Sequence, residues 1–260
     1  MMLLEGKVAV ITGGGYGIGR VIALEFAKAG ADVVLAARSV ARLEEVKAEV
    51  EALGRRALAV ATDITQEADV QRLAEQALAH FGQVDVLVNN SGIGGPVAPL
   101  WEVEPAEWEQ TFDVNVKGTY LCCRAFLPSM TERQTGSIIM IGSMTGKRPL
   151  LNRSAYCASK TALIGLVRAL AWDAAPYNIR VNLISPGAVD GERIKWGIRS
   201  LATAHNVSFE KATELFTRDS PFKRLVTPEE VANTALFLAS DMSTGTTGED
   251  VNVSAGVVMY

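Results

Sequence analysis

The residues that decide the fold are 7–22, KVAVITGGGYGIGRVI. A short apolar run is followed by a glycine-rich turn and then by an amphipathic segment that begins near Gly17. Glycine permits a tight turn and close approach of a ligand to the backbone, while a helix N-terminus offers free N–H groups. The stretch predicts a strand, a phosphate-binding turn and a helix. Its spacing, G-x-x-x-G-x-G, is not the common G-x-G-x-x-G fingerprint. The alternative interpretation, a tight strand-to-helix connection that binds no phosphate, therefore stays open.

The same alternation continues along the chain. Short apolar runs without clean alternation are typical of strands buried on both faces of a sheet. The expected strands are residues 7–12, 31–37, 57–62, 84–89, 137–141, 179–185 and 249–253. The expected helical segments are residues 17–29, 40–53, 66–80, 105–133, 153–175 and 191–217, with one more after Pro228. This order predicts an α/β fold with a single doubly wound (Rossmann-type) parallel sheet and helices on both faces.

Composition limits the domain count and the partners. No linker rich in Gly, Ser or Pro divides the 260 residues, so we expect one dinucleotide-binding and catalytic domain over 1–260. A net charge of −4 without a basic run argues against binding of nucleic acid or anionic membrane. The apolar runs are far shorter than the ~20 residues of a membrane span, and no signal peptide is evident, which favours a cytoplasmic location. The three cysteines have no metal-binding spacing, so no metal is expected.

The end of the second strand bears on the choice of cofactor. The run 31–37 is followed by Arg38 and contains no carboxylate at its end. An acidic residue there would accept from the ribose 2′-OH of NAD, whereas an arginine accommodates the 2′-phosphate of NADP. NADP is therefore favoured and NAD stays possible, since Arg38 could also be a solvated surface charge. Asp63, after the third strand, could meet the adenine or cap the helix that starts near Gln66.

Residues suited to proton transfer follow later in the chain. Ser143 comes just after the apolar run 137–141, at the carboxyl end of an expected strand. Tyr156 and Lys160 are four residues apart on an expected helix and share one face. A nearby ammonium group favours phenolate and lowers the pKa of a tyrosine from about 10, which suits an acid or base near neutral pH. We expect Tyr156 to exchange a proton with an alcohol or carbonyl oxygen to which Ser143 donates a hydrogen bond.

These segments together resemble the classical short-chain dehydrogenase/reductase family. The matching motifs are TGGGYGIG (12–19), NNSG (89–92), the asparagine of FDVNVKG, the pair Tyr156 and Lys160, and Pro186-Gly187, and they occur in the family's order. The resemblance implies a nicotinamide-dependent oxidoreductase that interconverts a secondary alcohol and a ketone. The implied catalytic residues are Asn115, Ser143, Tyr156 and Lys160. The implied cofactor-binding residues are Gly13, Tyr16, Gly17, Ile18, Gly19, Arg38, Asp63, Ile64, Asn90, Gly92, Tyr156, Lys160, Pro186, Gly187 and Val189.

Three departures qualify this resemblance. Tyr16 stands where many NADP-using members have Lys or Arg, which weakens the preference for NADP. Gly191 stands where the family often has a Thr that contacts the nicotinamide amide, so backbone near Val189 is expected to hold that amide. Ser254 and Ala255 replace residues of the family's usual V-D-G-G ending, and no consequence of this change is predicted.

The resemblance makes residues 188–221 a lid over the substrate. Trp196 and Phe209 are expected to pack this lid onto the body of the protein rather than to touch substrate, and His205 is expected at the surface. Family members commonly form tetramers through the helices near 105–133 and 153–175 and the last strand, so we expect a homo-oligomer, most simply a tetramer.

The substrate is expected to be a small polar molecule. Lys147, Arg148, Asn152 and Arg153 precede Tyr156 and would suit a polyol, a sugar or a hydroxy acid, although polar loop residues are commonly just solvated. A bulky ketone and a 3-oxoacyl thioester are alternatives, the second implying a 3-oxoacyl-carrier-protein reductase. A non-catalytic dinucleotide sensor is a third hypothesis, but such a protein would not need Ser143, Tyr156 and Lys160 together.

Overall fold

The computed structural model describes residues 2–260. Seven strands form a sheet in the order β3-β2-β1-β4-β5-β6-β7, and every neighbouring pair is parallel. β1 lies between β2 and β4, so the order of the strands reverses beside it, as in other doubly wound sheets. The strands are β1 (Val8–Thr12), β2 (Asp32–Ala37), β3 (Ala57–Ala61), β4 (Val86–Asn89), β5 (Gly136–Ile141), β6 (Ile179–Pro186) and β7 (Asp250–Val253).

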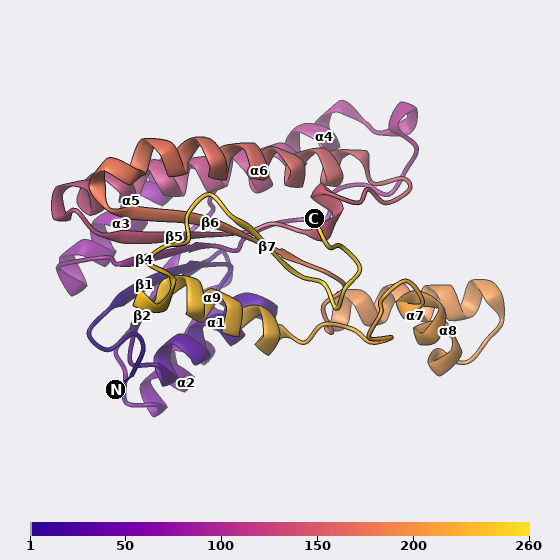
Figure 1. Cartoon of the computed structure of the whole chain (residues 1–260), viewed down its shortest axis with the longest axis horizontal. Helices are drawn as coiled ribbons and strands as arrows, with labels where there is room; N and C mark the ends of the chain where they lie inside the picture. Colours follow the sequence, from indigo (N-terminus) through magenta and orange to yellow (C-terminus); the bar gives the residue numbers. More distant parts are fainter. Residues whose placement is uncertain (1) are drawn as a thin grey trace.

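Helices cover both faces of this sheet, which confirms the predicted fold class (Figure 1). On one face lie α1 (Gly17–Lys28), α2 (Val40–Ala52) and α9 (Pro228–Ala239); on the other lie α3 (Glu67–Phe81), α5 (Gly118–Arg133) and α6 (Ser154–Ala174). Successive strand residues point to opposite faces. Val10 therefore enters the core under α3, α5 and α6, and Ile11 enters the core under α1, α2 and α9.

Two expected helices are divided in the structure. The segment 105–133 consists of α4 (Pro105–Phe112), a π-helical turn η2 (Asp113–Lys117) and α5. The segment 191–217 consists of α7 (Glu192–His205) and α8 (Phe209–Thr217), because Asn206 turns into the left-handed region at φ 49° and Ser208 then caps α8. Figure 1 shows α7 and α8 extending away from the sheet.

Short 3₁₀ turns complete the chain. They are η1 (Leu100–Glu102), η3 (Met144–Gly146), η4 (Ala175–Tyr177) and η5 (Asp241–Ser243). No helix within residues 2–260 is both long and apolar enough to cross a membrane.

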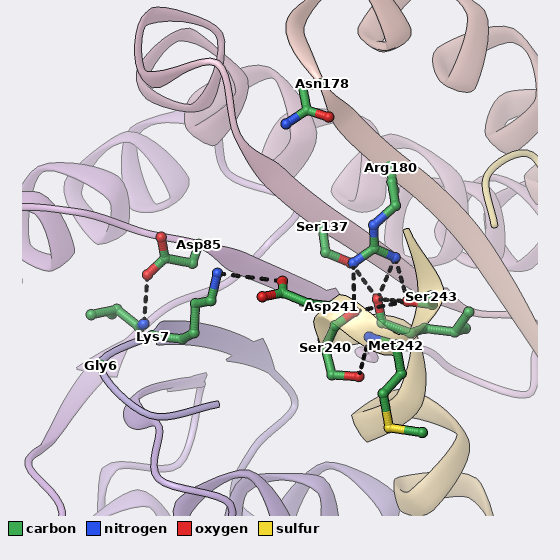
Figure 2. Close-up of polar contacts among 12 residues, drawn as sticks. Gly6, Lys7, Asp85, Ser137, Asn178, Arg180, Ser240, Asp241, Met242 and Ser243 are labelled. Carbon is green, nitrogen blue, oxygen red and sulfur yellow. Dashed lines mark hydrogen bonds and ion pairs between the residues drawn. The ribbon is translucent and has the colours of Figure 1, made fainter. Parts of the chain in front are cut away.

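The amino ends of the strands carry a structural polar cluster (Figure 2). Arg180 of β6 donates to the carbonyl oxygens of Leu238 (2.7 Å) and Ser240 (3.1 Å) and to the hydroxyl of Ser243 (2.6 Å). The last carbonyls of a helix lack intrahelical donors, so this guanidinium completes the end of α9 and fixes it to the sheet. A small cavity of about 90 Å³ lies beside Arg180, at the edge opposite the residues expected to carry the chemistry.

Candidate active site

The carboxyl ends of four adjacent strands bring the expected site residues together. β1, β4, β5 and β6 are neighbours and run in one direction, so the loops after them meet at one edge of the sheet. These loops contain the glycine-rich turn 13–16, the turn 90–92, Ser143 and Gly187. In open parallel sheets this edge is where ligands bind.

The glycine-rich turn after β1 is packed too tightly for side chains. A Cβ on Gly19 would lie 2.3 Å from the carbonyl oxygen of Gly13, and Gly13 itself has φ +65°. Tyr16 precedes α1 without a side-chain cap, which leaves the first N–H groups of that helix to another partner. Gly17, also left-handed at φ +56°, is exposed and Ile18 is half-buried. This cradle of bare backbone at a helix N-terminus fits a pyrophosphate.

Thr12 was not predicted as a site residue, yet it ties two loops together. Its Oγ1 accepts hydrogen bonds from the backbone N–H groups of Asn90 and Ser91, both at 3.0 Å. The Asn90 side-chain amide donates back to the carbonyl oxygens of Thr12 (2.9 Å) and Gly13 (3.3 Å). Asn90 thus braces the glycine-rich turn with its NH₂ group. No local sequence pattern reveals this pairing, since the residues are more than 70 positions apart.

Two arginines lie at the end of β2, where an adenosine would be expected. Arg38 is exposed, and Arg42 lies over the ring of Tyr16 at 5.3 Å from its centroid. A Cβ on Gly15 would lie 3.2 Å from that of Arg42, so the first turn of α2 rests against the glycine-rich turn. Within the described chain neither guanidinium has a carboxylate partner, whereas Arg20 of α1 pairs with Glu49. Arg42 is a candidate residue that the sequence did not indicate.

Asp63 and Ile64, which follow β3 and are expected to contact the adenine, also make contacts within the protein. Asp63 Oδ1 accepts from the backbone N–H (3.0 Å) and hydroxyl (2.8 Å) of Thr65, forming a turn. The alternative of Asp63 as a helix cap is wrong, because α3 begins at Glu67 and is preceded by Gln66 as its N-cap. The Ile64 side chain is buried against Gly118.

Asn115 and Lys160 lie around Gly92, and Tyr156 lies beside Lys160. The exposed fractions of Tyr156 and Lys160 are 8% and 5%, and the Lys160 ammonium lies 5.8 Å from the Tyr156 ring centroid. Lys160 Nζ donates to the carbonyl oxygen of Ile141 at 2.8 Å, which joins α6 to the end of β5. A Cβ on Gly92 would lie 3.2 Å from Asn115 Oδ1 and 3.4 Å from Lys160 Nζ. The structure therefore places three of the four expected catalytic residues in one cluster.

The π-helical turn explains how Asn115 reaches this cluster. The Asn115 side chain binds both backbone groups of Ile93: Oδ1 accepts from N–H at 2.8 Å and Nδ2 donates to C=O at 3.0 Å. Nδ2 also donates to the Ser159 hydroxyl at 3.0 Å, beside Lys160. One extra residue per turn in a helix often marks a functional site, and here it directs an amide between α6 and the loop after β4.

Ser143, the fourth expected catalytic residue, begins the turn η3 after β5. Its backbone is extended and its Oγ accepts from the N–H (3.2 Å) and hydroxyl (3.0 Å) of Thr145, which leaves the Ser143 hydroxyl proton for another acceptor. Gly146 of this turn lies against the backbone of Lys160, where an added Cβ would be 3.1 Å away. The turn is thus seated on the same helix that carries Tyr156.

The loop after β6 matches the expected nicotinamide side. Gly187 donates its N–H to Val253 at 2.9 Å, and a Cβ there would lie 2.9 Å from the Cα of Ser254, so the Pro186-Gly187 turn needs glycine. Val189 forms an isolated parallel bridge with Val226. The two hydrogen bonds of this bridge are made by the residues on either side of Val189: Asp190 N–H donates to the carbonyl oxygen of Val226, and Val226 N–H donates to the carbonyl oxygen of Ala188. Within residues 2–260 the N–H and C=O of Val189 itself have no hydrogen-bond partner, which fits a contact with a carboxamide.

Several expectations about the surrounding loops are wrong. Trp196 does not pack α7 onto the body, because 70% of it is exposed, whereas Ile198, two residues further along α7, is buried. Lys147 is not open to a substrate, since its side chain is only 10% exposed and its ammonium pairs with Asp250 at 2.9 Å, whereas Arg148 pairs with Asp219 at 2.9 Å and remains 44% exposed. These pairs join distant segments, so the local sequence could not show them.

The remaining residues singled out in the sequence can also be placed in the structure. Phe209 is more than one-third exposed, and His205 lies at the surface as expected. The Arg153 guanidinium lies 5.2 Å from the Tyr156 ring centroid.

Burial raises the pKa of the Cys123 thiol to about 12 and that of Cys122 further, so neither is a nucleophile. Within the described residues no three His, Cys, Asp or Glu side chains group together as metal ligands.

The fold and this cluster define a nicotinamide-dependent oxidoreductase of the Rossmann type, and comparison with known proteins identifies the family. A family model described as enoyl-(acyl carrier protein) reductase matches residues 13–258. The 7alpha-hydroxysteroid dehydrogenase of Escherichia coli (strain K12) is 36% identical over 255 residues, which cover 98% of this chain and 95% of that protein. The 3-oxoacyl-[acyl-carrier-protein] reductase of Thermotoga maritima is 33% identical over 261 residues, covering 99% of this chain and 100% of that protein.

A solved structure agrees with these relatives. L-sorbose reductase from Gluconobacter frateurii, complexed with NADPH and L-sorbose, has a TM-score of 0.94 and 34% identity, covering 100% of this chain and 99% of that one. The chain belongs to the classical short-chain dehydrogenase/reductase family. It is an NAD(P)-dependent oxidoreductase that interconverts alcohols and ketones.

Proposed function

We propose that this enzyme interconverts a small polar secondary alcohol and its ketone, with Tyr156 as the acid/base and NADP as the preferred cofactor. The observation that carries the proposal is that Lys160 lies beside both the Tyr156 ring and Asn115, on the helix against which the turn of Ser143 is packed. The bare backbone of the glycine-rich turn and the backbone of Val189, which has no hydrogen-bond partner within residues 2–260, fit the two ends of the cofactor. When bound, the nicotinamide supplies or accepts the hydride.

The protein's own residues handle the proton. In ketone reduction Tyr156 gives its phenolic proton to the carbonyl oxygen, and in alcohol oxidation the phenolate takes that proton back. The buried Lys160 ammonium beside the ring stabilises the phenolate. The Ser143 hydroxyl donates to the same substrate oxygen as its charge grows. Asn115 fixes Ile93 and Ser159 around Lys160, and so keeps the lysine's surroundings in place.

Tyr156→Phe tests the acid/base assignment. The ring stays and only the proton-bearing oxygen is lost, so kcat is expected to fall at least ~10³-fold while the Kd for NADPH changes little. Turnover is followed by the absorbance of NADPH and binding by calorimetry. The matched control is Tyr177→Phe, which removes the hydroxyl of a partly exposed tyrosine in η4 and should leave both values unchanged. Wild-type turnover in Tyr156→Phe would contradict the mechanism.

The preference for NADP rests on Arg38 and Arg42. Both guanidiniums lie near the adenosine end without carboxylate partners in the described chain, and β2 ends without an acidic residue. Arg42, held over the Tyr16 ring, provides a cation where Tyr16 has none. A 2′-phosphate would be bound by both groups.

Binding of paired cofactors measures this preference. Arg38→Gln and Arg42→Gln should each weaken NADPH binding roughly tenfold and leave NADH binding nearly unchanged, because only NADPH has the 2′-phosphate. Adenosine 2′,5′-bisphosphate and AMP serve as smaller probes of the same difference. Lys47→Gln, which removes an ion-paired charge from the same helix, is the control. Equal affinities of the wild type for NADPH and NADH would refute the preference.

The small polar substrate is supported by the likeness to L-sorbose reductase. A bulky apolar ketone is the second candidate, favoured by a specific observation: exposed apolar side chains lie on two loops near the site. These loops are joined by a hydrogen bond from Ala98 N–H to the carbonyl oxygen of Asn152, four residues before Tyr156. The exposed side chains are Val97, Leu100, Trp101, Leu150 and Leu151.

A substrate panel decides between these candidates. Ketoses, polyols, hydroxy acids, steroid ketones and 3-oxoacyl thioesters would be assayed with both cofactors. A small polar substrate predicts the highest kcat/KM for a ketose or polyol. The highest value for a steroid ketone would favour the apolar rim, and the highest for a thioester would favour the carrier-protein reductase.

Assembly and location complete the proposal. We expect a cytoplasmic homotetramer built through α5, α6 and the edge strand β7. Support comes from exposed aromatic residues on this face, Tyr120 and Trp172, and from three buried, unpaired cysteines that suit a reducing compartment. Light scattering after size-exclusion chromatography tests the assembly, and a monomeric mass would refute it.

A further inference from the structure

The turn that carries Ser143 is too short to hold its own position. η3 has three residues, and its internal bonds are Gly146 N–H to Ser143 (3.0 Å) and Lys147 N–H to Met144 (3.0 Å). A single 3₁₀ turn gains little from its own hydrogen bonds. Contacts at its two ends must therefore decide where the Ser143 hydroxyl lies.

The first contacts fix the residue before the turn and Gly146, the last residue of η3. Gly142 N–H donates to Ile184 of β6 at 2.7 Å, which extends the sheet to the residue before Ser143. Gly146 lies against the Lys160 backbone, and its carbonyl oxygen accepts from the Thr161 hydroxyl at 2.9 Å. These contacts hold η3 against α6, but they do not reach Lys147, the residue that caps the far end of the turn.

Lys147 anchors that far end to the edge strand. Its ammonium lies 2.9 Å from the carboxylate of Asp250, and it donates to Asn252 Oδ1 (2.8 Å) and to the Asp250 carbonyl oxygen (3.2 Å). Both side chains are buried, at 10% and 7% exposure. Within the described chain the Asp250 carboxylate oxygens have no other partner. The Tyr260 hydroxyl also donates to the Lys147 carbonyl oxygen at 3.4 Å.

We propose that Lys147 is a positioning residue for Ser143. A buried ion pair adds little to stability, because desolvation of the two charges offsets their attraction, but its directional bonds hold a segment in one place. Here that segment is the end of the turn that begins with Ser143. Loss of the ammonium frees the turn to move, and misplacement of a catalytic hydroxyl by about 1 Å costs rate rather than cofactor affinity. The inference rests on the proposed role of Ser143.

The experiment is a double-mutant cycle with Ser143. With NADPH and the best ketone of the substrate panel, Ser143→Ala is expected to lower kcat roughly hundredfold and Lys147→Met roughly tenfold, both with an unchanged Kd for NADPH. If Lys147 acts through Ser143, Lys147→Met has no further effect on kcat in the Ser143→Ala background. Arg124→Met, which breaks the ion pair of α5 with Glu67 of α3, is the matched control and should leave kcat unchanged.

A milder variant covers the case in which Lys147→Met does not fold. Asn252→Ala removes one acceptor and keeps both charges, and it should lower kcat roughly threefold in the wild type and not in Ser143→Ala. An equal loss in both backgrounds would show a general structural effect and overturn the positioning role, as would wild-type kcat in both variants. Wild-type kcat in Ser143→Ala would instead contradict the proposed function of Ser143 itself.

Discussion

Ala255 has a backbone conformation that alanine rarely adopts. It has φ +52°, in the left-handed region where a Cβ is unfavourable, and it stands beside Gly256 at φ +86°. Its carbonyl oxygen accepts from the Ser220 hydroxyl at 2.9 Å, while the preceding Ser254 closes a turn by accepting from Val258 N–H at 3.2 Å. The departure from the family's V-D-G-G ending therefore places strain beside the loop that supports Gly187.

Relief of this strain should stabilise the protein. Ala255→Gly is expected to raise the free energy of unfolding by about 0.5–1 kcal/mol, because glycine accepts this conformation while its greater freedom in the unfolded chain offsets part of the gain. Ala48→Gly, in the exposed interior of α2, is the control with the opposite sign and should cost about 1 kcal/mol. Urea unfolding of both variants gives the values. A lower stability for Ala255→Gly would contradict the strain.

At the scale of the element, α9 has a partner at each end. Thr227 accepts from the N–H of Glu230 at 3.3 Å, and Glu230 accepts from the N–H of Thr227 at 2.8 Å, which forms a capping box. Arg224 binds both carboxylate oxygens of Glu230. Its hydrogen bonds and that from Thr227 N–H lower the pKa of Glu230 from 4.5 to about 2. Arg180 completes the other end of the helix.

The capping box should make stability depend on pH. Because the folded-state pKa of Glu230 is below its unfolded value, the carboxylate stabilises the fold above pH 4.5, and this contribution is lost as pH falls toward about 2. Glu230→Gln should therefore unfold more easily than wild type at pH 7, with the difference shrinking below pH 4.5. Glu229→Gln, in the same helical turn, controls for the helix dipole. A difference that is constant from pH 7 to 3 would contradict the assignment.

At the scale of the whole molecule, helices enclose both faces of the sheet, whereas α7 and α8 lie outside these two layers. The sheet core lies between two layers of helices, whereas α7 and α8 pack mainly on each other and extend beyond the strands (Figure 1). Ile198 and Ala212 are buried, but Trp196 of α7 is exposed. We propose that residues 188–221 close over the substrate and that Trp196 becomes covered in that state.

Acrylamide quenching of Trp196 measures this closure. In a variant that keeps Trp196 as its only tryptophan, NADPH with a ketone substrate should lower the quenching constant, because a covered indole is less accessible. A matched variant that keeps only Trp172, which lies on α6 outside residues 188–221, should show no change whether or not a subunit contact covers it. Unchanged quenching of Trp196 with both ligands bound would contradict closure.

The sequence alone determined the parallel sheet, the glycine-rich turn and the Tyr156, Lys160 pair, because each depends on local periodicity and short spacing. The placement of Asn115 also follows from its motif, although the π-helical turn that directs it does not. Helix boundaries were predicted less well where one asparagine, Asn206, ends a helix inside a polar segment.

Only the tertiary structure decided which polar side chains are bonded within the protein and which are open to a ligand. Lys147 and Asp250 are 103 positions apart, and Thr12 and Asn90 are 78 apart, yet each pair is bonded. The exposure of Trp196 and the freedom of Arg42 from any carboxylate in the described chain likewise depend on which segments pack together. A sequence pattern indicates which residues share a face over one or two turns of a helix. The ion-pair or hydrogen-bond partner of a polar side chain depends instead on which distant segments pack against it.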